Sequence, residues 1–293
     1  MRDRIRLAAV EFDAGTASTE ENLEKLAAWC GCAREQGAEL ALFPELSVTG
    51  FIPNHPEGEH SAWLRDALRG ARRMAERLDG CTVRRLSEIA THTGMMIAAG
   101  MLEDAGNMLY NTHVLVGQAG LLGAWRKLHI PIFEMPLYNG GPAPPVVETQ
   151  LGKIGINICF DAFLPESTRL LAVQNAEIVL FPFAADPLPP GPAGWEQWAE
   201  PVLRARCAEN GVFGLASNYT GEVSFAGIQQ RFHGGALALG PDGNVLARGE
   251  RQPSEPRMLV VDFDRESLEC ARAGFEYTFR FRRPELYVSL ARS

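Results

Sequence analysis

Four side chains capable of acid–base or nucleophilic chemistry lie at or just beyond the ends of apolar segments in this sequence. Glu45 follows "LALFP", Lys127 follows "LLGAWR", and Cys159 closes the run "GKIGINI". A second acid, Glu134, comes one short segment after Lys127. If the apolar runs are strands of an α/β sheet, their carboxyl ends face one crevice and these groups can converge. A thiol nucleophile, a carboxylate that carries a proton and a cation that stabilises an oxyanion are the groups that amide hydrolysis requires.

Each of these residues also has a purely structural interpretation. An acid after Phe-Pro is most often a surface turn residue, and Lys127 beside Arg126 is usually part of a solvated pair. A single cysteine after an apolar strand is more often a core residue than a nucleophile. The whole set is therefore more specific than any one of its members.

The elements that must position these residues alternate between strands and helices. Strands are expected at Ile5–Phe12, Ala38–Glu45 and Met258–Asp264, and in the segments "MMIAAGML", "LYNTHVLVG", "KIGINIC", "EIVLFPFAA" and "VFGLASNY". Helices are expected from the possible capping box of Ser18 and Glu21 to about Gly37, and at Ser61–Arg77, Thr82–Thr93, Pro165–Asn175 and Trp195–Asn210. Pro241-Asp242-Gly243 predicts a hairpin turn, and Asp186–Gly194 a loop. Continuous apolar strands indicate burial on both faces, as in a sheet covered by helices on one side and a second sheet on the other.

Composition narrows the class of protein. The 293 residues carry 28 basic and 36 acidic side chains, a net charge of −8, which argues against a nucleic-acid partner. The longest apolar runs are far shorter than the ~18 residues that span a bilayer. The first residues lack the apolar core of a signal peptide, so we expect a cytoplasmic protein without a membrane partner. The chain has six cysteines, of which only Cys30 and Cys32 are close in sequence, and neither a C-x-x-C nor an H-x-x-x-H pair. This pattern predicts free thiols and no metal site.

Four longer motifs reveal a resemblance. "LALFPELSVTG", "WRKLHIP", "EMPLYNGG" and "GKIGINICFDAFLPE" resemble the successive motifs of the carbon–nitrogen hydrolase (nitrilase) superfamily, and "LYNTHVLV" and "RARCAENGVFGLASN" agree with it. The resemblance runs from about Arg4 to Tyr287. It implies an α/β fold, a four-layer α-β-β-α sandwich, as a single domain over residues 1–293. It also implies a homodimer or larger homo-oligomer, with residues from about 265 to 293 packing on the partner.

The resemblance assigns roles residue by residue. It makes Cys159 the nucleophile, Glu45 the general base and acid, and Lys127 the third catalytic member, while Glu134 matches a second glutamate near the substrate. The backbone N–H of Phe160 is expected to help Lys127 stabilise the oxyanion. Further candidates for the substrate pocket or its support are His129, Phe133, Asp161, Phe163, Trp195 and Asn218.

The residues after the cysteine favour one branch of the superfamily. Phe160-Asp161 is similar to the Tyr-Asp of the amidase and carbamoylase branches, and differs from the Trp-Glu typical of nitrilases. The expected reaction is hydrolysis of a small linear amide or N-carbamoyl compound through an acyl-enzyme, with water and without a cofactor. Two alternatives remain open: an acyl transferase that uses the same acyl-enzyme, and a catalytically silent scaffold.

Overall fold

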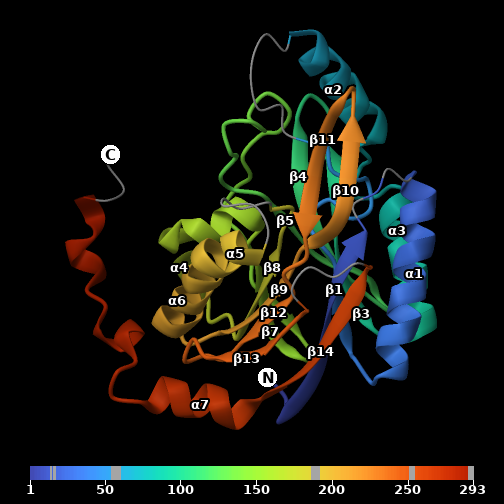
Figure 1. Cartoon of the computed structure of the whole chain (residues 1–293). Helices are drawn as coiled ribbons and strands as arrows, with labels where there is room; N and C mark the ends of the chain where they lie inside the picture. Colours follow the sequence, from blue (N-terminus) through green and yellow to red (C-terminus); the bar gives the residue numbers. More distant parts are fainter. Residues whose placement is uncertain (14, 16–17, 54–60, 186–191, 251–254, 290–293) are drawn as a thin grey trace.

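Two mixed β-sheets lie face to face in the computed structural model, which describes residues 1–13, 15, 18–53, 61–185, 192–250 and 255–289 (Figure 1). The larger sheet has the order β11 (Ile228–His233), β10 (Tyr219–Phe225), β1 (Arg4–Asp13), β2 (Leu40–Leu42), β3 (Met96–Asp104), β4 (Leu109–Gly117), β5 (Gly120–Arg126), with β14 (Arg257–Asp264) antiparallel to β1. The smaller sheet has the order β13 (Val245–Arg248), β12 (Leu237–Leu239), β9 (Phe213–Ser217), β8 (Ile178–Pro182), β7 (Gly152–Ile156), β6 (Val147–Thr149).

Helices cover the outer face of each sheet. Figure 1 shows α1 (Thr19–Glu35) and α3 (Cys81–Thr93) outside the larger sheet, and α4 (Pro165–Ala172) and α6 (Glu200–Asn210) outside the smaller one. The remaining helices are α2 (Ser61–Met74), α5 (Pro192–Gly194) and α7 (Arg265–Ala273). The layers therefore run helix, sheet, sheet, helix, which confirms the predicted α/β class.

Strand β1 shows why its sequence is apolar at nearly every position. Leu7 and Ala9 belong to the core between the two sheets. Ala8 and Val10 belong to a second core, which includes Leu26 of α1 and further side chains from α3. Since neighbouring side chains in a strand point to opposite faces, a strand buried on both faces must be apolar throughout.

Several local predictions are confirmed. Ser18 Oγ accepts from the Glu21 N–H at 3.2 Å while Glu21 accepts from the Ser18 N–H at 2.8 Å, so the capping box that begins α1 is present. The hairpin of β12 and β13 turns through Gly243, whose φ of 80° lies in the region that favours glycine.

Other predictions need correction. The strand expected at Ala38–Glu45 covers only Leu40–Leu42, because the chain turns after Phe43 to form the loop that carries Glu45. The predicted loop Asp186–Gly194 lies mostly outside the described residues, and its last part, Pro192–Gly194, is helical. The hairpin of β10 and β11 was missed, because its strands are largely polar where they leave the body.

The C-terminal segment differs from the rest of the fold. After α7 the chain continues through two short 3₁₀ turns, Thr278–Phe281 and Pro284–Leu286, and Figure 1 shows it ending away from the two sheets. No helix among the described residues has both the length and the apolar character needed to cross a membrane.

Candidate active site

Cys159 lies at a sharp elbow between the smaller sheet and a helical turn. Strand β7 ends at Ile156, Ile158 is still extended, and a 3₁₀ turn covers Cys159–Phe163. The φ angle of Cys159 is +48°, a conformation that costs a non-glycine residue about 1–3 kcal/mol. Such strain persists only where the surrounding structure enforces it, and here it places the thiol at the end of the strand, as the sequence predicted.

Glu45 is fixed by three hydrogen bonds in the loop after β2. Its Oε1 accepts from Lys127 Nζ at 2.7 Å and from Asn111 Nδ2 at 2.6 Å. Its Oε2 accepts from the backbone N–H of Ala184, beyond β8, at 3.0 Å. The carboxylate is fully buried and held by both sheets, so its orientation depends on the packing of the sandwich.

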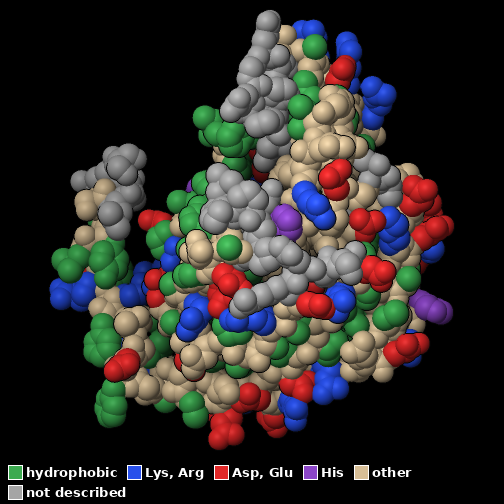
Figure 2. Space-filling model, viewed as in Figure 1, with side chains coloured by type: hydrophobic (Ala, Val, Ile, Leu, Met, Phe, Trp, Pro, Cys, Tyr) green, Lys and Arg blue, Asp and Glu red, His purple; other side chains and the backbone are tan. Residues whose placement is uncertain are grey.

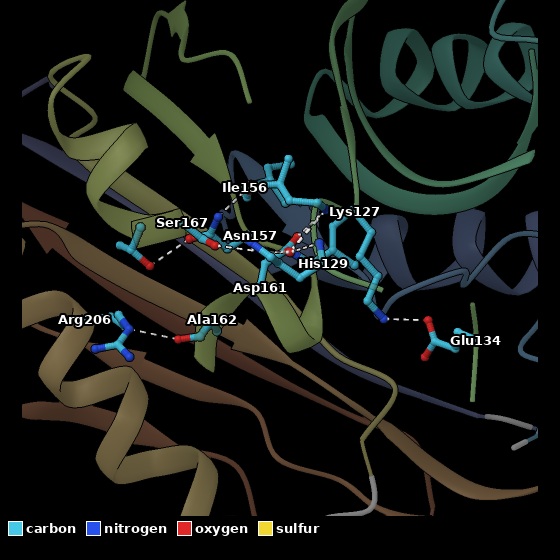
Figure 3. A network of polar contacts seen from close by, with 12 residues as sticks. Lys127, His129, Glu134, Ile156, Asn157, Asp161, Ala162, Ser167 and Arg206 are labelled. Carbon is cyan, nitrogen blue, oxygen red and sulfur yellow. Dashed lines mark hydrogen bonds and ion pairs between the residues drawn. The ribbon is translucent and has the colours of Figure 1, made fainter. Parts of the chain in front are cut away.

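Lys127 joins the two predicted glutamates. It follows β5, is fully buried, and donates to Glu134 Oε2 at 2.8 Å as well as to Glu45. Figure 3 shows the Lys127 side chain reaching towards Glu134. Glu134 lies in a tight turn in which its backbone N–H donates to Pro131 O at 2.8 Å. The structure therefore brings together three of the four predicted catalytic residues in direct contact.

Burial and mutual charge set the protonation of this cluster. Burial alone would lower the pKa of Lys127, but the charges of Glu134 and Glu45 raise it, so the ammonium form is retained. Burial raises the pKa of Glu134 to about 7 against the opposing charge of Lys127, and the like charge of Glu45 adds to the increase. Within this cluster, Glu134 is thus the group that exchanges a proton near neutral pH.

The charges of this cluster also act on the Cys159 thiol. Burial first, and the charge of Glu45 second, raise the pKa of Cys159 well above its ordinary value, while the charge of Lys127 opposes the increase. Cys159 is therefore a neutral thiol at rest. A base must remove its proton before or during any attack by the sulfur.

Asp161 connects the elbow to the chain that follows β5. Its carboxylate accepts from the backbone N–H of His129 at 2.8 Å, from that of Leu128 at 3.1 Å, and from that of Ile158 at 3.3 Å. It also contacts His129 Nδ1 at 3.0 Å, and this hydrogen bond raises the pKa of the half-exposed imidazole. Figure 3 shows Asp161 between the elbow and the Lys127–His129 segment. Asp161 thus fixes the spacing between Cys159 and Lys127.

The predicted pocket residues do not all lie together. Phe160 and Phe163 stay partly exposed beside the elbow, whereas Phe133 has 52% of its surface exposed on the turn that carries Glu134. Asn218 donates to Ala185 O and Gly234 O, both at 2.8 Å, and accepts from the Ala185 N–H. Its amide thus holds the segment that supports Glu45.

Two partners of Glu45 were not predicted. Asn111 belongs to "LYNTHVLV", which supported the family resemblance but carried no assigned role. Ala184 contributes only a backbone N–H, and no side-chain pattern indicates such a donor. Among the described residues, no group of three or more histidine, cysteine or acidic side chains could hold a metal ion.

Comparison with known proteins decides the family. The sequence profile of the carbon–nitrogen hydrolase family matches residues 6–273. This protein belongs to the carbon–nitrogen hydrolase family. As a carbon–nitrogen hydrolase, it is similar to the N-carbamoylputrescine amidase of Solanum tuberosum (29% identity; 98% of this chain, 94% of the relative). It is also similar to the citrullinase of Francisella tularensis (27% identity; 98% of each chain).

A solved amidase from Nesterenkonia sp. AN1 shares the fold with a TM-score of 0.76 and 25% identity, over 98% of this chain and 99% of that one. In that structure of a mutant, acrylamide has added to the active-site cysteine. These relatives identify the protein as a carbon–nitrogen hydrolase of the amidase type.

Proposed function

We propose that this carbon–nitrogen hydrolase cleaves a small linear amide or N-carbamoyl compound through an acyl-enzyme on Cys159. One observation carries the proposal: the buried Lys127 ammonium bridges Glu45 and Glu134, and its charge and that of Glu45 both act on the thiol at the strained elbow. A cation, a base and a nucleophile that influence one another in this way are the minimum set for acyl transfer.

The first half of the reaction forms the acyl-enzyme. Glu45 accepts the thiol proton as Cys159 Sγ attacks the carbonyl carbon, and a tetrahedral oxyanion forms. Lys127 Nζ and the Phe160 N–H stabilise that oxyanion; the first N–H groups of a helical turn have no partner within the turn. Glu45 then gives its proton to the departing nitrogen as the carbon–nitrogen bond breaks.

The second half regenerates the thiol. Glu45 takes a proton from water, whose oxygen attacks the thioester carbon, and the same two donors stabilise the second oxyanion. Collapse releases the acid, and the proton on Glu45 returns to the sulfur. Glu134 keeps Lys127 charged and in place while Glu45 changes its protonation state.

The names of the relatives support the substrate class. An N-carbamoylputrescine amidase and a citrullinase are both named for substrates that carry a terminal carbamoyl group, and the Nesterenkonia protein is an amidase. A terminal amide or carbamoyl nitrogen is therefore the proposed leaving group.

The test is the mass of the intact protein after rapid acid quench, with a panel of amides, N-carbamoyl amines and nitriles. Wild type should gain the mass of one acyl or carbamoyl group, and Cys159→Ala should gain nothing. Cys207→Ala removes another buried thiol, in α6, and should still form the adduct. An adduct that persists in Cys159→Ala, or turnover without Cys159, would contradict the proposal.

A further inference from the structure

Five aromatic side chains form a continuous wall beside the elbow: Phe160, Phe163, Phe183, Trp195 and Trp198. We call them the aromatic wall. Phe163 stacks on Trp198 with ring centroids 4.0 Å apart and an interplanar angle of 24°. Phe163 also meets Phe183 edge-on at 6.3 Å, and Phe183 meets Trp195 edge-on at 5.1 Å. Phe160 completes the wall at 6.2 Å from Phe163.

The aromatic wall is continuous with the reacting groups along the backbone. Phe160 directly follows Cys159. The carbonyl of Phe183 accepts from the Glu45 N–H at 3.3 Å, and the next residue, Ala184, donates to the Glu45 carboxylate. Phe160 and Phe163 keep part of their surface exposed, so a molecule whose carbonyl reaches Cys159 can contact their rings, whereas Phe183 is fully buried.

Hydrogen bonds from Arg206 and a helical turn support the aromatic wall. Arg206 donates to Ala162 O at 2.9 Å, as Figure 3 shows, and to Phe163 O at 3.1 Å. These hydrogen bonds fix the backbone at Phe163. Trp195–Ala199 form a π-helical turn, a feature frequently found at functional sites. Within this turn the side chain of Trp195 is buried, while that of Trp198 keeps 48% of its surface exposed. This exposed indole gives a ligand access to the aromatic wall.

The cationic side chains around the site already have partners. Lys127 is bound by two carboxylates, Arg206 by carbonyl groups and Glu209, and His129 by Asp161. A carboxylate on the substrate would have to compete with these contacts. Aromatic rings, in contrast, favour apolar and flat groups, since they bury large areas and stack.

We infer that the aromatic wall binds the non-reacting end of the substrate and selects an uncharged apolar or aromatic group there, with Trp198 as a specificity-determining residue. The inference rests on the proposed function for the position of the reacting carbonyl, and it goes further by specifying the opposite end of the substrate.

Direct binding tests it independently of turnover. Calorimetry on Cys159→Ala would compare pentanamide, 3-phenylpropanamide, 4-aminobutanamide and glutaramate, which differ in the group at the remote end. The first two should bind at least about 5-fold more tightly than the charged pair, and 3-phenylpropanamide most tightly. Equal binding of all four, tighter binding of the ammonium or carboxylate compound, or no binding of any would overturn the inference.

Substitution of Trp198 is the second binding test of the inference. In the Cys159→Ala background, Trp198→Ala should weaken 3-phenylpropanamide by roughly 5- to 10-fold, while Trp198→Phe retains the stack and most of the affinity. Trp198→Leu replaces Trp198→Ala if the latter does not fold. Leu246→Ala, at a side chain of matched exposure on β13, is the control and should leave the affinity unchanged. An equal effect of Trp198→Ala and Leu246→Ala would refute a role for Trp198.

Turnover separates this inference from the proposed function. If 3-phenylpropanamide binds as expected but wild type forms no adduct with any compound, the proposed function fails and the aromatic wall stands. If wild type hydrolyses acetamide and shows no preference for 3-phenylpropanamide, the aromatic wall fails and the proposed function stands.

Discussion

Lys127 carries one positive charge between two buried carboxylates, so the protonation of Glu134 depends on the charges of both Lys127 and Glu45. Burial raises the pKa of Glu134 to about 7, whereas the Cys159 thiol stays protonated at rest. The site therefore does not rely on a preformed thiolate. It depends on a fixed carboxylate that accepts the thiol proton during attack, and the pH dependence of the rate tests the contribution of Glu134.

Glu134→Gln should move the acid limb of the pH profile. In wild type, kcat/KM should rise with pH through an apparent pKa of about 7, as Glu134 loses its proton. The variant has one carboxylate on Lys127 and no like-charge repulsion, so its acid limb should lie at lower pH.

The control for this experiment is Glu103→Gln. Glu103 is a buried acid on β3 that pairs with Arg126 and Thr112 outside the cluster. This control should lower stability without moving the acid limb. An unchanged acid limb in Glu134→Gln would show that Glu134 is not the group whose protonation limits the rate.

At the scale of elements, the site depends on how strand ends are held together. The pairing of β14 with β1 fixes the end of the fold to its first strand, and Asp262 binds Arg6 Nε at 2.7 Å and also contacts Arg4. Hydrogen bonds from Arg6 keep the pKa of Asp262 well below its ordinary range. A carboxyl with a lowered folded-state pKa stabilises the fold above its unfolded pKa, and this contribution is lost as the pH falls through the folded value.

Asp262→Asn should therefore lower the free energy of unfolding at pH 7 by about 1 kcal/mol or less, since both arginines are largely exposed. The difference from wild type should shrink as the pH falls into the acid range. Urea denaturation at a series of pH values measures it. Asp79→Asn breaks an exposed pair with Arg77 in one loop and should have no measurable effect. A constant difference at every pH would argue against the ion pair as its cause.

On the scale of the whole molecule, the C-terminal segment carries apolar side chains that the rest of the protein leaves exposed (Figure 2). Phe275 is 95% exposed, and Phe281 and Leu286 exceed 60%. The segment is nevertheless tied to the body, because Arg272 donates to Gly211 O and Ala176 O. The resemblance predicts an oligomer, and we propose that a second copy of the chain covers this segment.

The double substitution Phe275→Ser/Phe281→Ser should reduce the molar mass in solution, as measured by size-exclusion chromatography with light scattering, because it removes the apolar contacts proposed to hold the copies together. The double substitution Leu121→Ser/Leu246→Ser changes exposed apolar residues on β5 and β13 and should leave the mass unchanged. If wild type and both variants have the same mass, the segment does not form the interface.

The sequence by itself determined the class of fold and the family, and it predicted Glu45, Lys127, Glu134 and Cys159 as catalytic residues. These follow from local signals: apolar runs buried on both faces, caps such as Ser18, and motifs in which a reactive residue follows a strand. The tertiary structure alone decided how the residues act on one another. Asn111 and the Ala184 N–H reach Glu45 from β4 and from beyond β8, Asp161 ties the elbow to the segment after β5, and Trp198 stacks on Phe163. The physical reason is that hydrogen bonds, desolvation and ring stacking depend on distances between segments far apart in the chain, which no local pattern encodes.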